Sequence, residues 1–182
     1  MALRYGLPYF LEDTTGLLSG TKFIDLYGRM RFLYTRRLRS ESQTVYDIYD
    51  ESDNSTQKNV PVVTLTFGPR HCLGTIQYRN EQPRNMDQYL SQLNLFAGTK
   101  LRRFFASDGR EYRWGWRKVA GDEWTCTNSD GEIIADYSHK VPGEPEYTTS
   151  GSMFTVTEEY GHLATEMLAT VTIMRQILAY DM

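Results

Sequence analysis

A single change of hydrophobic period, near residue 157, constrains the fold of this chain more than any other feature. Before it, apolar and polar residues alternate along most of the sequence, as in Val63–Phe67 (VTLTF) and Glu111–Trp116 (EYRWGW). Alternation with a period of two is typical of half-buried β-strands. From about residue 158 to 180 the period is helical, and Met167–Met174 (MLATVTIM) is apolar or Thr on every face. Because such a helix must be buried all round, we expect a mainly β fold whose sheet curves or closes around it.

Turn residues separate the strand-like runs and a capping residue precedes the helix. Asp108-Gly109, Gly121-Asp122 and Asp130-Gly131 each stand between two alternating runs, which is typical of β-hairpins. Thr157 followed by two acidic residues suits the positive N-terminal end of a helix. We therefore predict one domain over residues 1–182, with the helix over about 158–180 and residues 1–20 as a peripheral arm.

Composition narrows the classes of function. The 182 residues include 20 Lys and Arg against 23 Asp and Glu, which gives a net charge of −3 and argues against a nucleic-acid binder. Cys72 and Cys126 are too few for a four-ligand zinc site, and we expect neither a metal nor a cofactor. The N-terminal residues lack the apolar run of a signal peptide, and no stretch approaches the roughly 20 apolar residues of a membrane span. These features predict a cytoplasmic protein and leave its oligomeric state open.

Several segments resemble a known family. They are Lys22–Asp25, Gly28–Thr35, Arg102–Phe105, Asp108–Trp114, Ile134–Tyr137 and Thr170–Met174. Together they look like a fungal, basidiomycete-type family of unknown function in the tubby C-terminal-like superfamily, which includes the LURP-one-related proteins and the phospholipid scramblases. The resemblance implies an antiparallel β-barrel of about ten to twelve strands around a buried C-terminal helix. It also implies lipid association for some members of the superfamily, but it transfers no reaction and no site residue to this chain.

The beginning of the predicted helix carries one group of candidate site residues. Glu158, His162 and Glu166 are spaced at i, i+4 and i+8, so a regular helix would place them on one face. There they would line a pocket at one mouth of the barrel, with His162 as a proton donor or ligand contact. The simpler interpretation is a polar stripe that faces water.

Two short motifs offer weaker candidates. His71 and Cys72 are the only adjacent pair of the kind found in cysteine enzymes, but neighbours on a strand point to opposite faces. A rim histidine beside a buried cysteine is the simpler interpretation. The sequence Asp13-Thr-Thr-Gly16 superficially resembles an aspartic-protease motif, but its extra Thr breaks the spacing and no second copy exists. We discard it as a catalytic motif.

Basic residues interleave with aromatic ones before the C-terminal helix. Trp114 and Trp116 alternate with Arg113 and Arg117, and with Tyr160 they are our candidate ligand-binding residues. Aromatic side chains that point inward and arginines that cover the outer face would explain the same pattern. We expect a binding module for a hydrophobic or anionic small molecule, a lipid or a partner protein. The alternative is a cyclase, isomerase or lyase that acts on an apolar molecule in a pocket walled by these aromatics.

Overall fold

The alternating segments form strands whose inward side chains build the core. The structure is a computed structural model that describes residues 6–52, 55–93, 100–118, 123–138, 150–180 and 182. In the described residues the strands are β1 (Tyr9–Asp13), β2 (Gly20–Asp25), β3 (Arg31–Arg39), β4 (Thr44–Asp50), β5 (Val63–Phe67), β6 (Leu73–Tyr78), β7 (Arg84–Asn85), β8 (Ser91–Gln92), β9 (Leu101–Phe105), β10 (Glu111–Trp116), β11 (Trp124–Thr127), β12 (Ile133–Ser138) and β13 (Ser152–Val156). The helical elements are η1 (Pro69–His71), α1 (Met86–Tyr89), η2 (Glu158–Leu163) and α2 (Ala164–Tyr180). The predicted mainly β fold with a C-terminal helix is confirmed.

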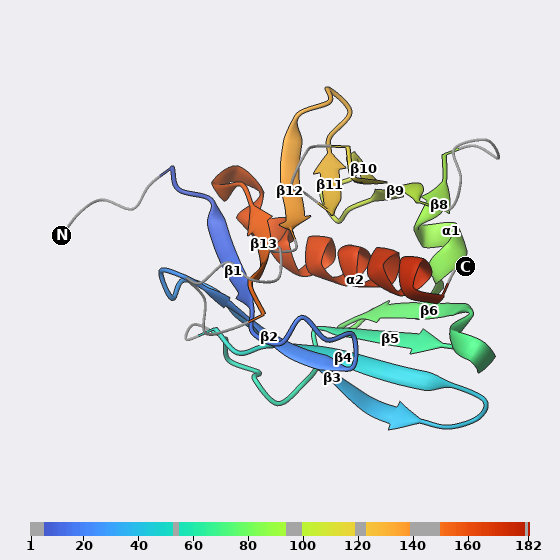
Figure 1. The fold of residues 1–182 in the computed structure, drawn as a ribbon. Coiled ribbons are helices and arrows are strands. Elements are labelled where there is room, and N and C mark those ends of the chain that lie inside the picture. Colours follow the sequence, from blue (N-terminus) through green and yellow to red (C-terminus); the bar gives the residue numbers. More distant parts are fainter. Residues whose placement is uncertain (1–5, 53–54, 94–99, 119–122, 139–149, 181) are drawn as a thin grey trace.

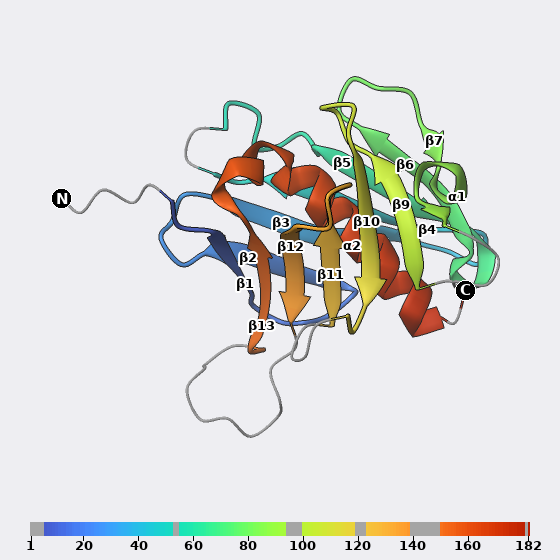
Figure 2. The ribbon, with the colours of Figure 1, turned by 90° about the horizontal axis from the view of Figure 1, so that it is seen from above.

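One antiparallel sheet contains all thirteen of these strands, in the order β7-β6-β5-β4-β3-β2-β1-β13-β12-β11-β10-β9-β8. Strands that follow one another in the chain pair, except for β7 and β8, which form the two edges of the sheet. The pairing of β1 with β13 joins a first half, β1 to β7, to a second half, β8 to β13. The two halves lie on opposite sides of α2 (Figure 1), and Figure 2 shows the strands of the second half crossing the helix. β1 lies within the first 20 residues, which we expected to form a peripheral arm, yet it pairs with strands on both sides.

The expected closed barrel is wrong, because the sheet stays open between β7 and β8. These edge strands are two residues long each, and α1 occupies the chain between them. The Asn85 side chain caps α1 by accepting hydrogen bonds from the backbone N–H groups of Asp87, at 2.9 Å, and Gln88, at 3.2 Å. The chain therefore forms the short helix α1 directly after β7, at the point where a strand that closed the barrel would have to continue. Met86 and Leu90 are buried there, so α1 contributes to the core between the two sheet edges.

The predicted turns at Asp108-Gly109 and Asp130-Gly131 are confirmed as hairpin turns. Gly109 lies between β9 and β10 and Gly131 lies between β11 and β12, and both adopt a positive φ that suits glycine. The third predicted turn, Gly121-Asp122, lies outside the described residues.

The C-terminal helix differs from its prediction at its start. Residues 158–163 form the 3₁₀ helix η2, and the α-helix begins at Ala164 and ends at Tyr180. From Met167 to Ile177 every residue of α2 is buried. Hydrogen bonds tie it to both halves of the sheet: the Trp114 indole N–H of β10 donates to Thr170 Oγ1 at 2.8 Å, and Gln176 Nε2 donates to the Tyr34 hydroxyl of β3 at 3.2 Å. Among the described residues no helix is long and apolar enough to span a membrane.

Candidate functional site

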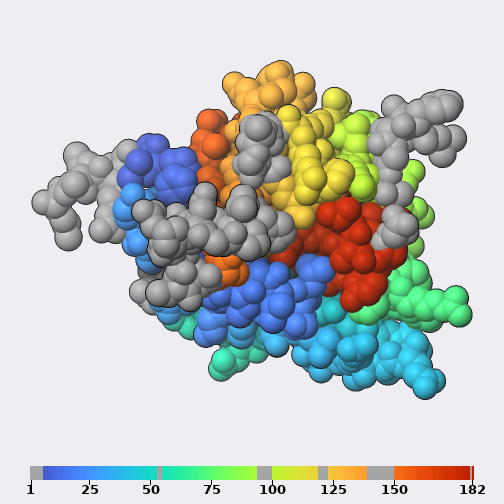
Figure 3. Space-filling view, viewed as in Figure 1, coloured from blue at the N-terminus to red at the C-terminus, as the bar shows by residue number. Residues whose placement is uncertain are grey.

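A cavity of about 350 Å³ opens beside the C-terminal end of α2. It is lined by Gly16, Leu17, Leu18, Glu123, Arg175, Leu178 and Ala179. The leucines of the loop between β1 and β2 face the last turns of the helix here, and Figure 3 shows that the end of α2, in red, reaches the surface next to the first strands, in blue. Aliphatic side chains therefore form most of the wall, and a single guanidinium group supplies its positive charge.

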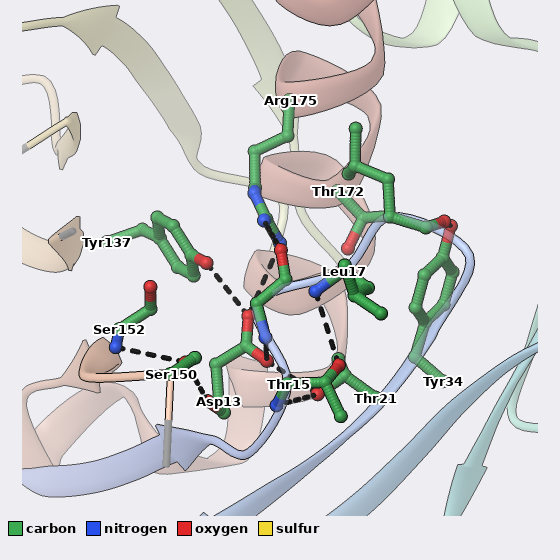
Figure 4. A network of polar contacts seen from close by, with 12 residues as sticks. Asp13, Thr15, Leu17, Thr21, Tyr34, Tyr137, Ser150, Ser152, Thr172 and Arg175 are labelled. Atoms are coloured by element: carbon green, nitrogen blue, oxygen red, sulfur yellow. Dashed lines mark hydrogen bonds and ion pairs between the residues drawn. The ribbon is translucent and has the colours of Figure 1, made fainter. Parts of the chain in front are cut away.

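Arg175 is the cation in the wall of this cavity, and its side chain is buried. Its side chain is 7% exposed and extends from α2 toward the end of β1 (Figure 4). Nη2 donates to the carbonyl oxygen of Gly16 at 2.9 Å, and Nη1 lies 3.5 Å from Oδ2 of Asp13. The guanidinium carbon lies 4.3 Å from the centre of the Tyr137 ring, which is cation–π geometry. These contacts stabilise a charge that would be costly to bury alone.

Asp13 holds this network together from the other side. It is fully buried at the end of β1, where Leu11 and Asp13 occupy successive inward positions. Its Oδ1 accepts hydrogen bonds from the Thr21 hydroxyl at 2.5 Å and from the Gly16 backbone N–H at 2.8 Å. Its Oδ2 accepts one from the Tyr137 hydroxyl at 2.8 Å. Asp13 thus has three short hydrogen bonds from neutral donors in addition to the longer contact with Arg175.

The network leaves Arg175 with spare hydrogen-bonding capacity. A guanidinium group has five N–H donors, and the contacts described above use one on Nη1 and one on Nη2. Burial raises the pKa of Tyr137 far above its usual value, an effect that the charge of Asp13 increases and that of Arg175 opposes. The tyrosine therefore stays protonated and donates to Asp13, so it does not compete for the donors of Arg175. The remaining N–H groups can serve an anion in the cavity.

The three predicted helix residues are not brought together. Glu158 accepts a hydrogen bond from the backbone N–H of Gly6, whereas Glu166 accepts from the backbone N–H of Ser107 at 2.9 Å and also from its hydroxyl. His162 is exposed. Residues four apart do not align in a 3₁₀ helix, which has three residues per turn, so η2 breaks the stripe that a regular helix would form. Within the described ranges, no group of three or more His, Cys, Asp or Glu side chains is placed to hold a metal ion.

The predicted ligand-binding residues divide between core and surface. Trp114 is fully buried, and Tyr160 is 9% exposed. Arg113 lies on the outer face of β10 and pairs with Glu111 at 2.7 Å. The Trp116 ring is covered by two cations, with Lys100 Nζ at 3.9 Å and the Arg117 guanidinium at 4.6 Å from its centre. The lining of the cavity at the end of α2 includes none of the predicted residues.

His71 lies next to the end of α2 and does not pair with Cys72. Its ring stacks on that of Tyr180, with 3.9 Å between the ring centres. Burial lowers the pKa of His71, and the nearby charges of Arg39 and Arg36 lower it further. Cys72 is exposed and His71 is half-buried, so the sequence-based interpretation of a buried cysteine beside a rim histidine is wrong for the cysteine.

Sequence reasoning missed Asp13 and Arg175, although each left a signal. Arg175 and Gln176 are polar residues that directly follow Met167–Met174, the stretch that is apolar or Thr on every face. Asp13 occupies an inward position in the alternation of β1, where an apolar residue would be expected. When two elements each carry a charged residue at a position expected to be buried, and the two charges are opposite, the residues are expected to pair in the core.

Comparison with models of protein families gives a match over most of the chain. A family model with the description "Family of unknown function (DUF6593)" matches residues 21–177. The matched range includes Arg175 and Glu166 but begins after Asp13. It confirms the sequence-based expectation of a family of unknown function over most of the chain. No curated protein and no solved structure shows significant similarity.

Proposed function

We propose that this chain, which belongs to the DUF6593 family of unknown function, is a binding module for a small amphiphilic anion. The observation that supports this function is the Arg175 guanidinium in the wall of a largely aliphatic cavity. The volume of the cavity, about 350 Å³, is near the lower end of the range for small-molecule sites, about 300–1,000 Å³. A medium-length alkyl chain with one anionic head group matches both the size and the lining.

The charges in the cavity favour a head group with a single negative charge. A carboxylate or sulfate accepts two parallel hydrogen bonds from a guanidinium, which are stronger than bonds between neutral groups. Glu123 lies in the same cavity, and its carboxylate would repel a doubly charged head group more strongly than a singly charged one. Leu17, Leu18 and Leu178 would contact the alkyl chain, whose transfer from water to an apolar wall is favourable.

The family resemblance supports an amphiphilic ligand but is not needed for this proposal. Some members of the tubby C-terminal-like superfamily associate with lipids, and we assign the chain to a fungal branch of that superfamily as part of the proposal. A cytoplasmic location also stays a prediction. The alternative of a cyclase, isomerase or lyase has no specific observation in its favour.

Calorimetric titration with octanoate, octanol and octyl sulfate tests the proposal. We expect both anions to bind at least about 10-fold more tightly than octanol, because a charged hydrogen bond contributes more than a neutral one. Ala179→Phe should abolish binding by filling the cavity from an exposed position, without a loss of thermal stability. Arg175→Lys should weaken binding of the anions only, whereas the outer-face control Arg113→Lys should have no effect.

Three outcomes would overturn the proposal. Equal affinity for octanoate and octanol would show that Arg175 does not bind the anionic head group. Unchanged binding by Ala179→Phe would show that the ligand does not bind in this cavity. Sedimentation with vesicles of anionic phospholipid that Ala179→Phe leaves unchanged would mean that the protein recognises anions on another surface.

A further inference from the structure

A second cavity, of about 360 Å³, lies where the sheet is open between its two edges. Its lining includes Tyr78 at the end of β6, Tyr89 at the end of α1, Phe105 at the end of β9 and Glu166 in the first turn of α2. Strand pairing stops here because α1 replaces a closing strand, and side chains from both edges surround the hollow instead. The same feature that makes the sheet open therefore creates the cavity.

Glu166 brings a negative charge into this cavity without a counter-charge. Its side chain is half-buried, and its two oxygens accept hydrogen bonds from the backbone N–H and the hydroxyl of Ser107. In the part of the chain that the structure describes, Glu166 forms no ion pair. Each carboxylate oxygen can accept a second hydrogen bond, so the group keeps capacity for a donor inside the cavity.

The lining as a whole is also more negative than positive. Glu81 and Arg84 at the rim pair with each other at 2.5 Å, and the Arg84 guanidinium lies 5.7 Å from the centre of the Tyr89 ring. Among the described residues of the lining, the one cation is therefore already paired, and the charge of Glu166 remains uncompensated. A negatively charged ligand would be repelled, and a positively charged one would be attracted.

Aromatic side chains also line this second cavity. The Tyr78 and Tyr89 hydroxyls lie 3.0 Å apart and share a hydrogen bond. Burial, with a smaller contribution from the charge of Glu166, raises the pKa of Tyr89 to about 12, so its ring stays neutral. Phe105 is 56% exposed, so one aromatic face at the rim is open to a ligand. Aromatic faces beside a carboxylate are the combination that binds organic cations in proteins.

We propose that this second cavity binds a small organic ammonium ion, with Glu166 as its counter-charge and Phe105 and Tyr89 as its aromatic contacts. An amine or a quaternary ammonium group would lie between the carboxylate and the rings. The ligand proposed for this cavity is a cation, whereas the ligand proposed for the cavity at the end of α2 is an anion. The two cavities are lined by different residues. Either proposal can therefore fail without the other.

Titration followed by nuclear magnetic resonance, with benzylamine, benzyltrimethylammonium, benzyl alcohol and benzoate, tests this inference. These probes share a ring and differ in charge. We expect both cations to shift the resonances of residues around Glu166 and to bind about 10-fold or more tightly than benzyl alcohol, while benzoate does not bind. Glu166→Gln keeps the size of the side chain and removes its charge, so it should abolish the preference for the cations.

Two further variants make the result decisive. Glu159→Gln removes a charge from an exposed residue of η2 that does not line the cavity, and it should bind the cations like the wild type. If Glu166→Gln fails to fold, Phe105→Ala serves in its place, because an exposed ring is dispensable for folding, and it should weaken cation binding several-fold. Three outcomes would overturn the proposal: equal binding of benzyl alcohol and benzylamine, a preference for cations that survives Glu166→Gln, or cation binding that Phe105→Ala leaves unchanged.

Discussion

The buried hydrogen bond between Trp114 and Thr170 allows the contact between sheet and helix to be tested with one substitution. The indole N–H donates to the Thr170 hydroxyl at 2.8 Å, and both residues are fully buried. Thr170→Val keeps the size and the branching of the side chain, but it leaves the indole N–H without an acceptor. A buried polar group without a partner costs about 1–3 kcal/mol. In a protein of this size each 1 kcal/mol lowers the melting temperature by about 2–4 °C, so we expect a decrease of about 2–12 °C.

Thr172→Val is the matched control for this experiment. Thr172 is buried on the same helix, but its hydroxyl donates to the Leu168 carbonyl at 2.8 Å within α2 itself. The Leu168 carbonyl also accepts a backbone hydrogen bond within the helix, so it keeps a partner when the Thr172 hydroxyl is removed. Thr172→Val should therefore lower the free energy of unfolding clearly less than Thr170→Val does. Thermal and urea unfolding followed by circular dichroism measures both variants.

Equal destabilisation by the two valine variants would refute this reasoning, because it would mean that the indole contributes nothing specific. A double-mutant cycle gives the second criterion. Trp114→Phe and Thr170→Val should be coupled, so that their combined loss is smaller than the sum of the single losses. Strict additivity would show that the two side chains do not interact.

Three further predictions test other parts of the fold. Leu168→Asp places an unpaired charge on a fully buried face of α2, and circular dichroism should show loss of the folded state. Burial by itself raises the pKa of Asp25, but hydrogen bonds from Arg29 lower it below its usual value. The stability from this pair is therefore present above about pH 4 and is lost as the pH falls through the lower pKa of the folded state, and Asp25→Asn should flatten that part of the curve of unfolding free energy against pH. A thiol reagent should label the exposed Cys72 in the native protein and reach the buried Cys126 only after unfolding; rapid labelling of both would contradict the core packing.

The sequence by itself determined the elements and their inward faces. The period of two placed Val63, Leu65 and Phe67 on the buried side of β5, because adjacent residues of a strand point to opposite faces. The all-round apolar stretch that contains Leu168 required a helix surrounded by the sheet, and α2 is buried from Met167 to Ile177. Local rules are enough for these features, since each depends on neighbours within a few residues.

Only the tertiary structure decided the candidate sites. Asp13 and Arg175 are 162 residues apart in the chain and meet because the loop that follows β1 lies beside the last turns of α2. Glu166 reaches a cavity because the short strands β7 and β8 leave the sheet open, and α1, which Asn85 caps, lies between them in the chain. Pairing between distant segments fixes both arrangements, and a period or a spacing within one segment carries no information about which distant segment it will meet.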